Sequence, residues 1–337
     1  MDVITKERTE PKTESETVCL LAKTRQAVKT KQAVKTKQAV KTRQLALSLG
    51  CNANGKTVLR DRYMAYPLSV SPIFRLEADG SGKNSALEQR AYLYRMNTSP
   101  GLLAGDRLGM SLTLHADAQL YLADQAATKV HTMPEPEQAE VHYEIKVGER
   151  ATLEFLPEPL ILFADSAIQQ ISDITLHPTA GLSWGEIIVP GRLARGEHYQ
   201  FHECWSTLRI REPNMREPAN MREPAGSVWF TESMRLLGKN NRFNQSALFA
   251  ERSMMGTLVL CLPSNLANRE EINQLSHSID ALETETLKVA SSVLPGERGL
   301  FIRAIASTTR ELQASFKAAI NQVRKLRGQA PLPYSMS

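Results

Sequence analysis

The chain has 337 residues, with 41 Lys and Arg against 36 Asp and Glu, which leaves a formal net charge of +5. A chain of this length can bury a sizeable core, as one large domain or two ordinary ones. No apolar run reaches the ~18 residues of a membrane-spanning helix, and no apolar segment follows the basic N-terminal residues. The sequence thus predicts neither a membrane protein nor a secreted one, and the acidic residues near the N-terminus are atypical of a transit peptide. We therefore expect a cytoplasmic protein.

The positive charge lies in residues 1–44, which hold 11 Lys and Arg against 5 Asp and Glu. The remaining residues carry a net charge of −1, so the folded part offers no basic surface for nucleic acid. Within the tail, Gln-Ala-Val-Lys-Thr-Lys/Arg occurs three times from Gln26, and this period of six suits neither an amphipathic helix nor a buried strand face. We expect residues 1–44 to be a disordered basic repeat tail. Its functional alternative is a tether to an anionic surface.

Short segments of alternating apolar and polar residues run from Leu45 to about residue 265, separated by Gly, Pro, Asn and Asp. With no helical periodicity before about residue 266, this pattern predicts a mainly β body over residues 45–265. The expected strands include a long one at residues 112–122 and one at residues 198–201. Arg-Glu-Pro recurs three times between residues 211 and 226, and the repeated proline predicts an enlarged, inserted loop there.

The segment 266–337 has a mixed pattern that predicts an α/β unit packed on the body. Apolar residues at helical spacing predict a helix over residues 268–284. Two strands are expected at residues 287–294 and 300–306. Thr308 or Thr309 then caps a last helix that extends to about Arg327, before two prolines stop it.

No catalytic constellation is evident in the sequence. The Gly-x-Ser-x-Gly, Walker A and His-Glu-x-x-His motifs are absent, and the Gly-rich residues 80–83 predict only a β-turn. The four cysteines form no Cys-x-x-Cys pair and are expected to be reduced thiols. His198, His202 and Cys204 would share one face of a strand, but the two histidines would be ~13 Å apart, too far for one ion. We predict no stable metal site.

Five segments, taken in chain order, resemble the UreD (UreH) family of urease accessory proteins. The first two are the turn Ser-Pro-Gly-Leu-Leu-Ala-Gly-Asp-Arg-Leu and the small-residue segment Leu-Ala-Asp-Gln-Ala-Ala-Thr-Lys-Val. The others are Gly-Lys-Thr-Val-Leu, a Leu-Glu-Phe-Leu-Pro-Glu-Pro stretch, and Trp-Gly-Glu followed by Gly-Arg and Arg-Gly-Glu. Together they lie within residues 50–235. The chain departs from the family pattern at Ala104, at Phe155 and in the position of Trp184 relative to Glu186.

The resemblance implies a fold and a function. The fold is a β-helix-like stack of short strands with two helices near the C-terminus. The function is urease maturation, in which a non-enzymatic scaffold or chaperone bridges apo-urease to UreF and, through UreF, to the GTP-binding UreG. Nickel then reaches the urease metallocentre, and no cofactor other than transient nickel is bound.

The family is thought to pass nickel along an internal water-filled path, and oxygen ligands hold Ni²⁺ weakly enough for transit. By resemblance the path candidates are Asp106, Thr128, Glu186 and Glu232, and the structural turn is Pro100, Gly101 and Gly105. A buried carboxylate needs a partner, which Lys129, Arg192 or Arg195 could supply.

The plainer interpretation of each path candidate stays open at this stage. Asp106 would only hydrogen-bond its own turn. Thr128 would only pair across strands, and Glu186 and Glu232 would be ordinary exposed strand acids.

Two other classes of function also stay open. A carbohydrate-active β-helical enzyme would place two carboxylates in an aromatic-lined groove, although only 6% of the residues are aromatic. A surface-tethered binding module would depend on residues 1–44. Deletion of those residues would abolish tethering but should leave urease maturation largely intact.

Overall fold

The computed structural model describes residues 43–75, 90–213, 226–239 and 241–332. The predicted basic tail up to Thr42, the predicted turn at residues 80–83 and most of the predicted loop at residues 211–226 lie outside these residues. The chain divides into two units, Met1–Thr42 and Arg43–Ser337, and only the second is described below.

The described residues form strands, three α-helices and three short 3₁₀ turns. The strands are β1 (Leu45–Cys51), β2 (Thr57–Met64), β3 (Leu68–Val70), β4 (Ala91–Asn97), β5 (Arg107–Leu114), β6 (Gln119–Asp124), β7 (Thr128–Val130), β8 (Ala139–Val147), β9 (Thr152–Leu156), β10 (Leu160–Leu162), β11 (Ala167–Leu176), β12 (Gly181–Val189), β13 (Glu203–Arg211), β14 (Val228–Leu237), β15 (Met254–Cys261), β16 (Leu287–Val293) and β17 (Gly299–Ala306). The helices are α3 (Ala247–Ala250), α4 (Arg269–Asp280) and α5 (Thr309–Leu326), and the 3₁₀ turns are η1 (Leu193–Arg195), η2 (Phe243–Gln245) and η3 (Pro295–Glu297).

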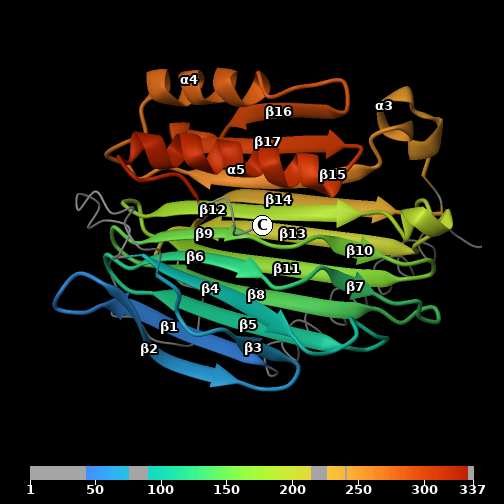
Figure 1. The fold of residues 1–337 in the computed structure, drawn as a ribbon, viewed down its shortest axis with the longest axis horizontal. Coiled ribbons are helices and arrows are strands. Elements are labelled where there is room, and N and C mark those ends of the chain that lie inside the picture. Colours follow the sequence, from blue (N-terminus) through green and yellow to red (C-terminus); the bar gives the residue numbers. More distant parts are fainter. Residues whose placement is uncertain (1–42, 76–89, 214–225, 240, 333–337) are drawn as a thin grey trace, which may run out of the picture. The chain divides into compact units, whose positions relative to one another are not determined.

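From β4 to β13 the chain passes back and forth between two sheets, so that each round trip forms one coil of a stack. The seven-stranded sheet has the order β14-β13-β11-β8-β5-β1-β2, and the larger sheet has the order β16-β17-β15-β12-β9-β6-β4-β3. The short strands β7 and β10 add to the larger sheet beside β12. Pairing is parallel from β5 to β13 and from β4 to β12. Figure 1 shows the strands stacked from blue to red, with β2 outermost at one end and β16 outermost at the other. The predicted β-helix-like stack is confirmed.

The core lies between the two sheets, because alternate residues of each strand point inward. Leu112 of β5, Ile145 of β8 and Ile174 of β11 form one such row and are at most 1% exposed. The facing sheet contributes Leu153 of β9 and Leu182 of β12 to the same apolar cluster. Full burial of each such side chain stabilises the fold by about 1.5–3 kcal/mol.

Three sequence-based predictions about the body are wrong. The strand expected at residues 112–122 is two strands, because β5 ends at Leu114 and the chain turns through Asp117, whose φ is +64°. The alternation of apolar residues continues across this turn and conceals it. Residues 198–201 form a loop, in which Tyr199 has a φ of +53°. The helix α3 was not expected, because one turn of helix is too short to show a period.

The C-terminal elements follow the predicted order closely. The helix α4, the strands β16 and β17 and the helix α5 lie within two to four residues of their expected bounds. Thr308 caps α5, since its hydroxyl accepts from the backbone N–H of Glu311 while the Glu311 carboxylate accepts from the backbone of Thr308. β15 and β17 extend the larger sheet beyond β12, so this segment continues the stack. No helix among the described residues is long and apolar enough to cross a membrane.

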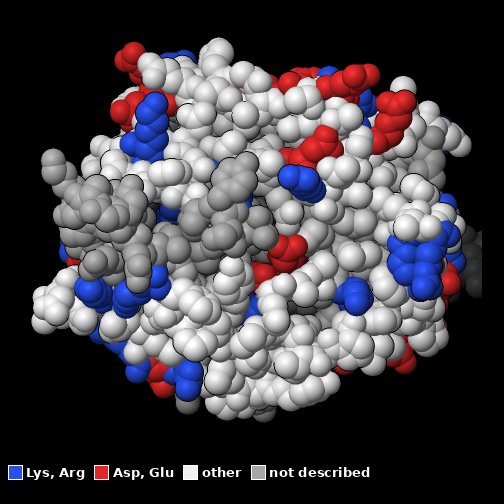
Figure 2. All heavy atoms as spheres, in the orientation of Figure 1, with Lys and Arg blue, Asp and Glu red and all other residues white. Residues whose placement is uncertain are grey.

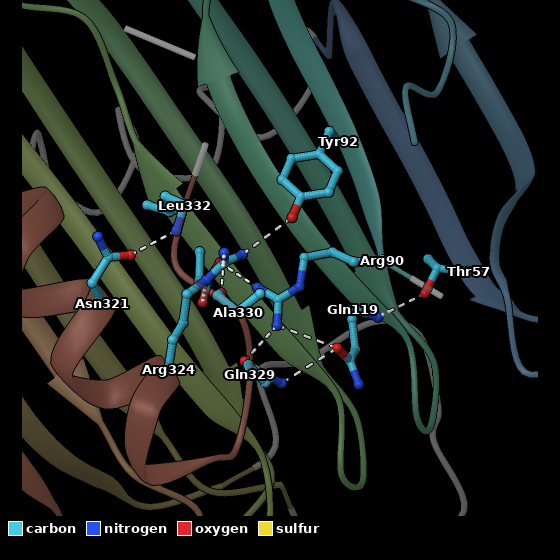
Figure 3. Close-up of polar contacts among 10 residues, drawn as sticks. Thr57, Arg90, Tyr92, Gln119, Asn321, Arg324, Gln329, Ala330 and Leu332 are labelled. Atoms are coloured by element: carbon cyan, nitrogen blue, oxygen red, sulfur yellow. Dashed lines mark hydrogen bonds and ion pairs between the residues drawn. The ribbon is translucent and has the colours of Figure 1, made fainter. Parts of the chain in front are cut away.

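Buried ion pairs hold α5 on the outer face of the larger sheet. Arg324 of α5 donates to both oxygens of Glu154 on β9, at 3.0 Å from Nε and 2.8 Å from Nη2. Arg90 donates to the same carboxylate, and Figure 3 shows Arg324 and Arg90 converging from the helix and from the sheet. Burial opposes ionisation of Glu154, but the two arginines outweigh it and lower its pKa to about 2. The helix is therefore held in one register on the sheet.

Candidate functional site

Glu186 of β12 stands at the centre of the candidate site. It alternates with Trp184 on the face of β12 that points between the sheets. Gln170 of β11 and Ser206 of β13 approach from the opposite sheet and donate hydrogen bonds to the carboxylate, with a distance of 3.1 Å from the Ser206 hydroxyl. None of the ion pairs among the described residues includes Glu186.

The surroundings of Glu186 favour its protonated form. Burial raises the pKa of Glu186 to about 7, the two hydrogen bonds offset only part of that effect, and the negative charge of Glu232 raises the pKa further. The carboxyl group therefore exchanges its proton in the neutral pH range. Because Glu186 forms no ion pair among the described residues, a cation that replaces its proton does not have to displace an arginine or lysine.

A cavity of about 60 Å³ lies on one side of Glu186. Asp124, Thr128, Tyr143 and Glu158 are among the polar residues that line it. A water molecule requires a cavity of ~10–15 Å³, so this one has room for a few waters. It is far below the ~300–1,000 Å³ of a pocket for a larger organic ligand such as a sugar.

The two acids in the wall of this cavity differ in whether an arginine pairs with them. Arg95 donates to both carboxylate oxygens of Asp124, at 2.7 and 2.8 Å, and to the hydroxyl of Tyr143 at 2.8 Å. Glu158 accepts a hydrogen bond of 3.1 Å from Gln313 of α5, and burial raises its pKa. The charge of Asp124 is thus compensated by Arg95, whereas Glu158 has no ion pair among the described residues.

Two further spaces continue from the other side of Glu186. A cavity of about 20 Å³ shares Glu186 with the first and also reaches Glu232 of β14 and Thr257 of β15. Glu232 and Thr257 also line an open groove of about 440 Å³ between β14 and the strands β15 and β17. The two cavities and the groove thus form a series. Glu186 lies at the boundary between the two cavities, and Glu232 lies at the boundary between the second cavity and the groove. Oxygen atoms at these boundaries suit a divalent cation that is held weakly.

The structure brings three of the four path candidates to this series and places the fourth elsewhere. Thr128 lines the first cavity, Glu186 lines both cavities, and Glu232 lines the second cavity and the groove. Asp106 lines none of these spaces. Its Oδ2 atom accepts a hydrogen bond of 2.8 Å from the backbone N–H of Leu103, so it closes its own turn.

The predicted structural turn packs closely on the small-residue segment. Gly101 has a φ of +148°, and a Cβ atom there would lie 2.5 Å from the carbonyl oxygen of Lys129. Its neighbour Leu102 exchanges backbone hydrogen bonds of 2.8 and 2.9 Å with this segment. Gly105 has a φ of +77° and open surroundings. Pro100 accepts a contact of 3.2 Å from the ring of His131 through its carbonyl oxygen.

The three basic residues considered as partners for a buried carboxylate have other positions. Arg192 forms an ion pair with Glu197. Arg195 lies in the exposed turn η1, and Lys129 is exposed on β7. Within the part of the chain that the structure describes, no hydrogen bond or ion pair links any of them to the four path candidates.

The sequence cluster of two histidines and a cysteine does not converge. His198 is exposed in a loop, His202 contacts Glu135 at 2.9 Å, and Cys204 is fully buried on β13. Burial also raises the pKa of the Cys204 thiol, which disfavours the thiolate that a metal requires. The predicted common strand face is therefore wrong. Among residues 43–75, 90–213, 226–239 and 241–332, no group of three or more His, Cys, Asp and Glu could hold a metal ion.

Sequence reasoning missed Gln170, Ser206 and the acids of the first cavity. A usable signal was present for Ser206, which lies between Cys204 and Leu208 on the inward face of its strand, but Gln170 has the polar Ser172 beside it. The sequence does not show which strands are neighbours or how they are aligned. Gln170 of β11 pairs with Ser206 of β13, and this pairing could not be predicted.

Charges on the described surface are mixed in sign. Figure 2 shows one face of the molecule, on which Lys and Arg lie in several separate groups interleaved with Asp and Glu. A surface for nucleic acid would instead gather its basic residues on one face or along one stripe.

Comparison with known proteins gives a consistent result over most of the chain. The family described as "UreD urease accessory protein" matches residues 41–336. The urease accessory protein UreD of Trichodesmium erythraeum is 40% identical over 291 residues, which cover 86% of this chain and 97% of the relative. Proteins of the same name from Actinobacillus pleuropneumoniae and Haloarcula marismortui are 30% and 27% identical, over 83% and 86% of this chain and 96% and 88% of the relatives.

Proposed function

Because the chain belongs to the UreD family of urease accessory proteins, we propose that it bridges apo-urease to a UreF–UreG complex and assists nickel delivery into the urease metallocentre. It is an accessory protein in urease maturation and not an enzyme. Its partners would be apo-urease and UreF, with UreG bound through UreF, and it would act in the cytoplasm.

The observation that carries the nickel part of this proposal is the position of Glu186. Its carboxylate is shared by the two cavities, and it is held only by the neutral donors Gln170 and Ser206. Nickel is the cargo here and not a resident cofactor. A cation that enters the first cavity would meet this carboxylate before it reaches Glu232 and the groove.

The chemistry of the lining suits transit better than storage. Carboxylate, hydroxyl and amide oxygens bind Ni²⁺ less tightly than imidazole or thiolate. Because burial raises the pKa of Glu186 to about 7, an arriving cation competes with a proton for this carboxylate near neutral pH. The cavities have room for a few waters, which supply the remaining ligands of a partly hydrated ion.

The two alternative functions receive less support. A glycosidase needs an open groove between its carboxylates, whereas Glu186 borders two cavities of about 60 and 20 Å³. A surface-tethered module would depend on the tail, which lies outside the described residues.

The experiment uses cells that express the urease subunits and all other accessory proteins, with and without this chain. We expect urease activity and bound nickel to collapse without the chain and to return when it is restored. UreF and UreG should also stop co-purifying with urease in its absence. A variant that begins at Arg43 serves as the control for tethering and should restore both readouts. Normal nickel loading without the chain would refute the proposal.

A further inference from the structure

The outer end of the cavity series carries a basic residue that the proposed nickel path does not need. Arg303 of β17 lines the groove, and its guanidinium forms an ion pair with Glu232 of β14. Glu232, Met234 and Thr257 line both the groove and the cavity of about 20 Å³, which is called the inner cavity below. A permanent positive charge therefore sits where a cation would pass between the two spaces.

The strand register explains why Arg303 reaches this position. Glu186 of β12 pairs with Thr257 of β15, and Thr257 pairs with Arg303 of β17. Paired residues on antiparallel strands point to the same face of the sheet, so these three form one row on the inward face. Neighbouring strands lie ~4.8 Å apart, which places Arg303 ~10 Å from Glu186 along the row.

Two contacts hold the guanidinium at this boundary. One is the ion pair with Glu232 from the facing sheet. The other is the ring of Phe301, which lines the inner cavity and lies 5.1 Å from the guanidinium carbon. The Arg303 side chain is nevertheless 63% exposed, so it can leave the boundary without unpacking the core.

We propose that Arg303 closes the outer end of the nickel path in the free protein. It does so by holding the Glu232 carboxylate in an ion pair and by placing a positive charge where a divalent cation would have to pass. The path opens when the guanidinium moves away and Glu232 becomes free to bind the cation. This inference rests on the proposed function, since it assigns a gate to the proposed path.

The test measures nickel arrival at Trp184, which lines both cavities. The purified full-length chain is labelled with 5-fluorotryptophan and titrated with NiCl₂, and paramagnetic broadening of each fluorine resonance is recorded. Trp205 points to the outer face of the seven-stranded sheet, where its indole N–H donates to the Ser233 hydroxyl, and it serves as the internal reference. Single Trp→Phe variants assign the three resonances.

The variants are Arg303→Met and Arg303→Gln, with Arg235→Met as a matched control. Arg235 forms an ion pair with Glu203 on the outer face and has the same side-chain exposure of 63%. We expect both Arg303 variants to lower at least tenfold the nickel concentration that half-broadens the Trp184 resonance. The wild type and Arg235→Met should behave alike, and adding Glu232→Gln to Arg303→Met should reverse most of the gain.

Equal broadening of Trp184 in the wild type and in both Arg303 variants would overturn the gate, as would an equal gain in Arg235→Met. Failure of the path itself is detected separately, by nickel loading of urease with a Glu186→Gln variant. If that variant blocks loading while the Arg303 variants leave broadening unchanged, the gate is wrong and the path stands. If that variant loads nickel normally, the path is wrong.

Discussion

Ser206 of β13 donates a hydrogen bond of 3.1 Å to the Glu186 carboxylate of β12, across the space between the two sheets. This contact joins the two sheets where the two cavities meet. It is a contact between a neutral donor and an acid, so it supplies no positive charge to Glu186, and burial favours the protonated form of the carboxyl group. Stability and nickel transfer should both depend on the protonation of Glu186.

The pH dependence of stability should report the state of Glu186. Its pKa is about 7 in the folded protein against 4.5 when unperturbed, so between these values the folded state keeps a proton that the unfolded state has lost. The free energy of unfolding therefore falls as the pH rises from 4.5 to 7, by about 3 kcal/mol, and the contribution is constant above that window.

The measurement for this prediction is urea unfolding of the wild type and Glu186→Gln at several pH values. Comparing the two proteins cancels the other titrating groups. We expect the stability advantage of Glu186→Gln to grow from pH 4.5 to pH 7 and then to level off. An advantage that does not change with pH would show that Glu186 titrates normally.

Removing the hydroxyl of Ser206 should shift this window. That hydrogen bond lowers the pKa of Glu186, so Ser206→Ala should raise the pKa further. The pH range over which the free energy of unfolding falls should then extend to higher pH. The measurement compares urea unfolding of Ser206→Ala with that of the double variant that also carries Glu186→Gln. Ser233→Ala, on the outer face of β14, should leave the window in place. An unshifted window in Ser206→Ala would contradict the contact.

Replacing Arg324 should loosen the last helix. Arg324→Met leaves the buried Glu154 carboxylate with Arg90 as its remaining ion-pair partner, so we expect a loss of about 3 kcal/mol in the free energy of unfolding. Lys325→Met changes an exposed neighbour on α5 and should cost less than about 0.5 kcal/mol. Hydrogen exchange should show faster exchange in α5 for the first variant only. Equal stability of the two variants would refute a structural role for the pair.

Two glycines of the same turn should differ in their tolerance of a side chain. Gly101→Ala combines an unfavourable φ with a Cβ atom 2.5 Å from a carbonyl oxygen, so we expect a loss of about 3 kcal/mol or more. Gly105→Ala has an unfavourable φ but open space, and should cost about 1 kcal/mol. Thermal unfolding of both variants provides the comparison. A larger loss at Gly105 would mean that the turn does not pack on Lys129 as described.

The sequence predicted the mainly β body and the late helices because those features are local, whereas the β-helix-like stack followed from the family resemblance. The apolar spacing of Ile272, Leu275 and Ile279 predicts α4, and those residues are buried as expected. The Thr308–Glu311 pair forms a capping box at the start of α5, where the sequence placed a cap. Alternation within short segments likewise predicted most strands of the body.

The candidate site could be predicted only in part, because it depends on register between distant strands. Glu186 and Glu232 were identified from the family resemblance, but their relation to Gln170, Ser206 and Arg303 follows from pairings such as Glu186 with Thr257, which are 71 residues apart. For Asp106, the plainer interpretation could be made from the sequence alone, because an acid in a glycine-containing turn can hydrogen-bond to the backbone of that turn. The structure shows this hydrogen bond, from the backbone N–H of Leu103.

The most direct test of the proposed path is the nickel content of urease matured with Glu186→Gln in place of the wild-type chain. Glu140→Gln, at an acid that is 20% exposed and forms an ion pair with Arg107, is the control. We predict at least a tenfold fall in nickel per urease active site with Glu186→Gln, normal loading with Glu140→Gln, and normal co-purification of both variants with urease. Full nickel loading with Glu186→Gln would contradict passage of nickel past this carboxylate.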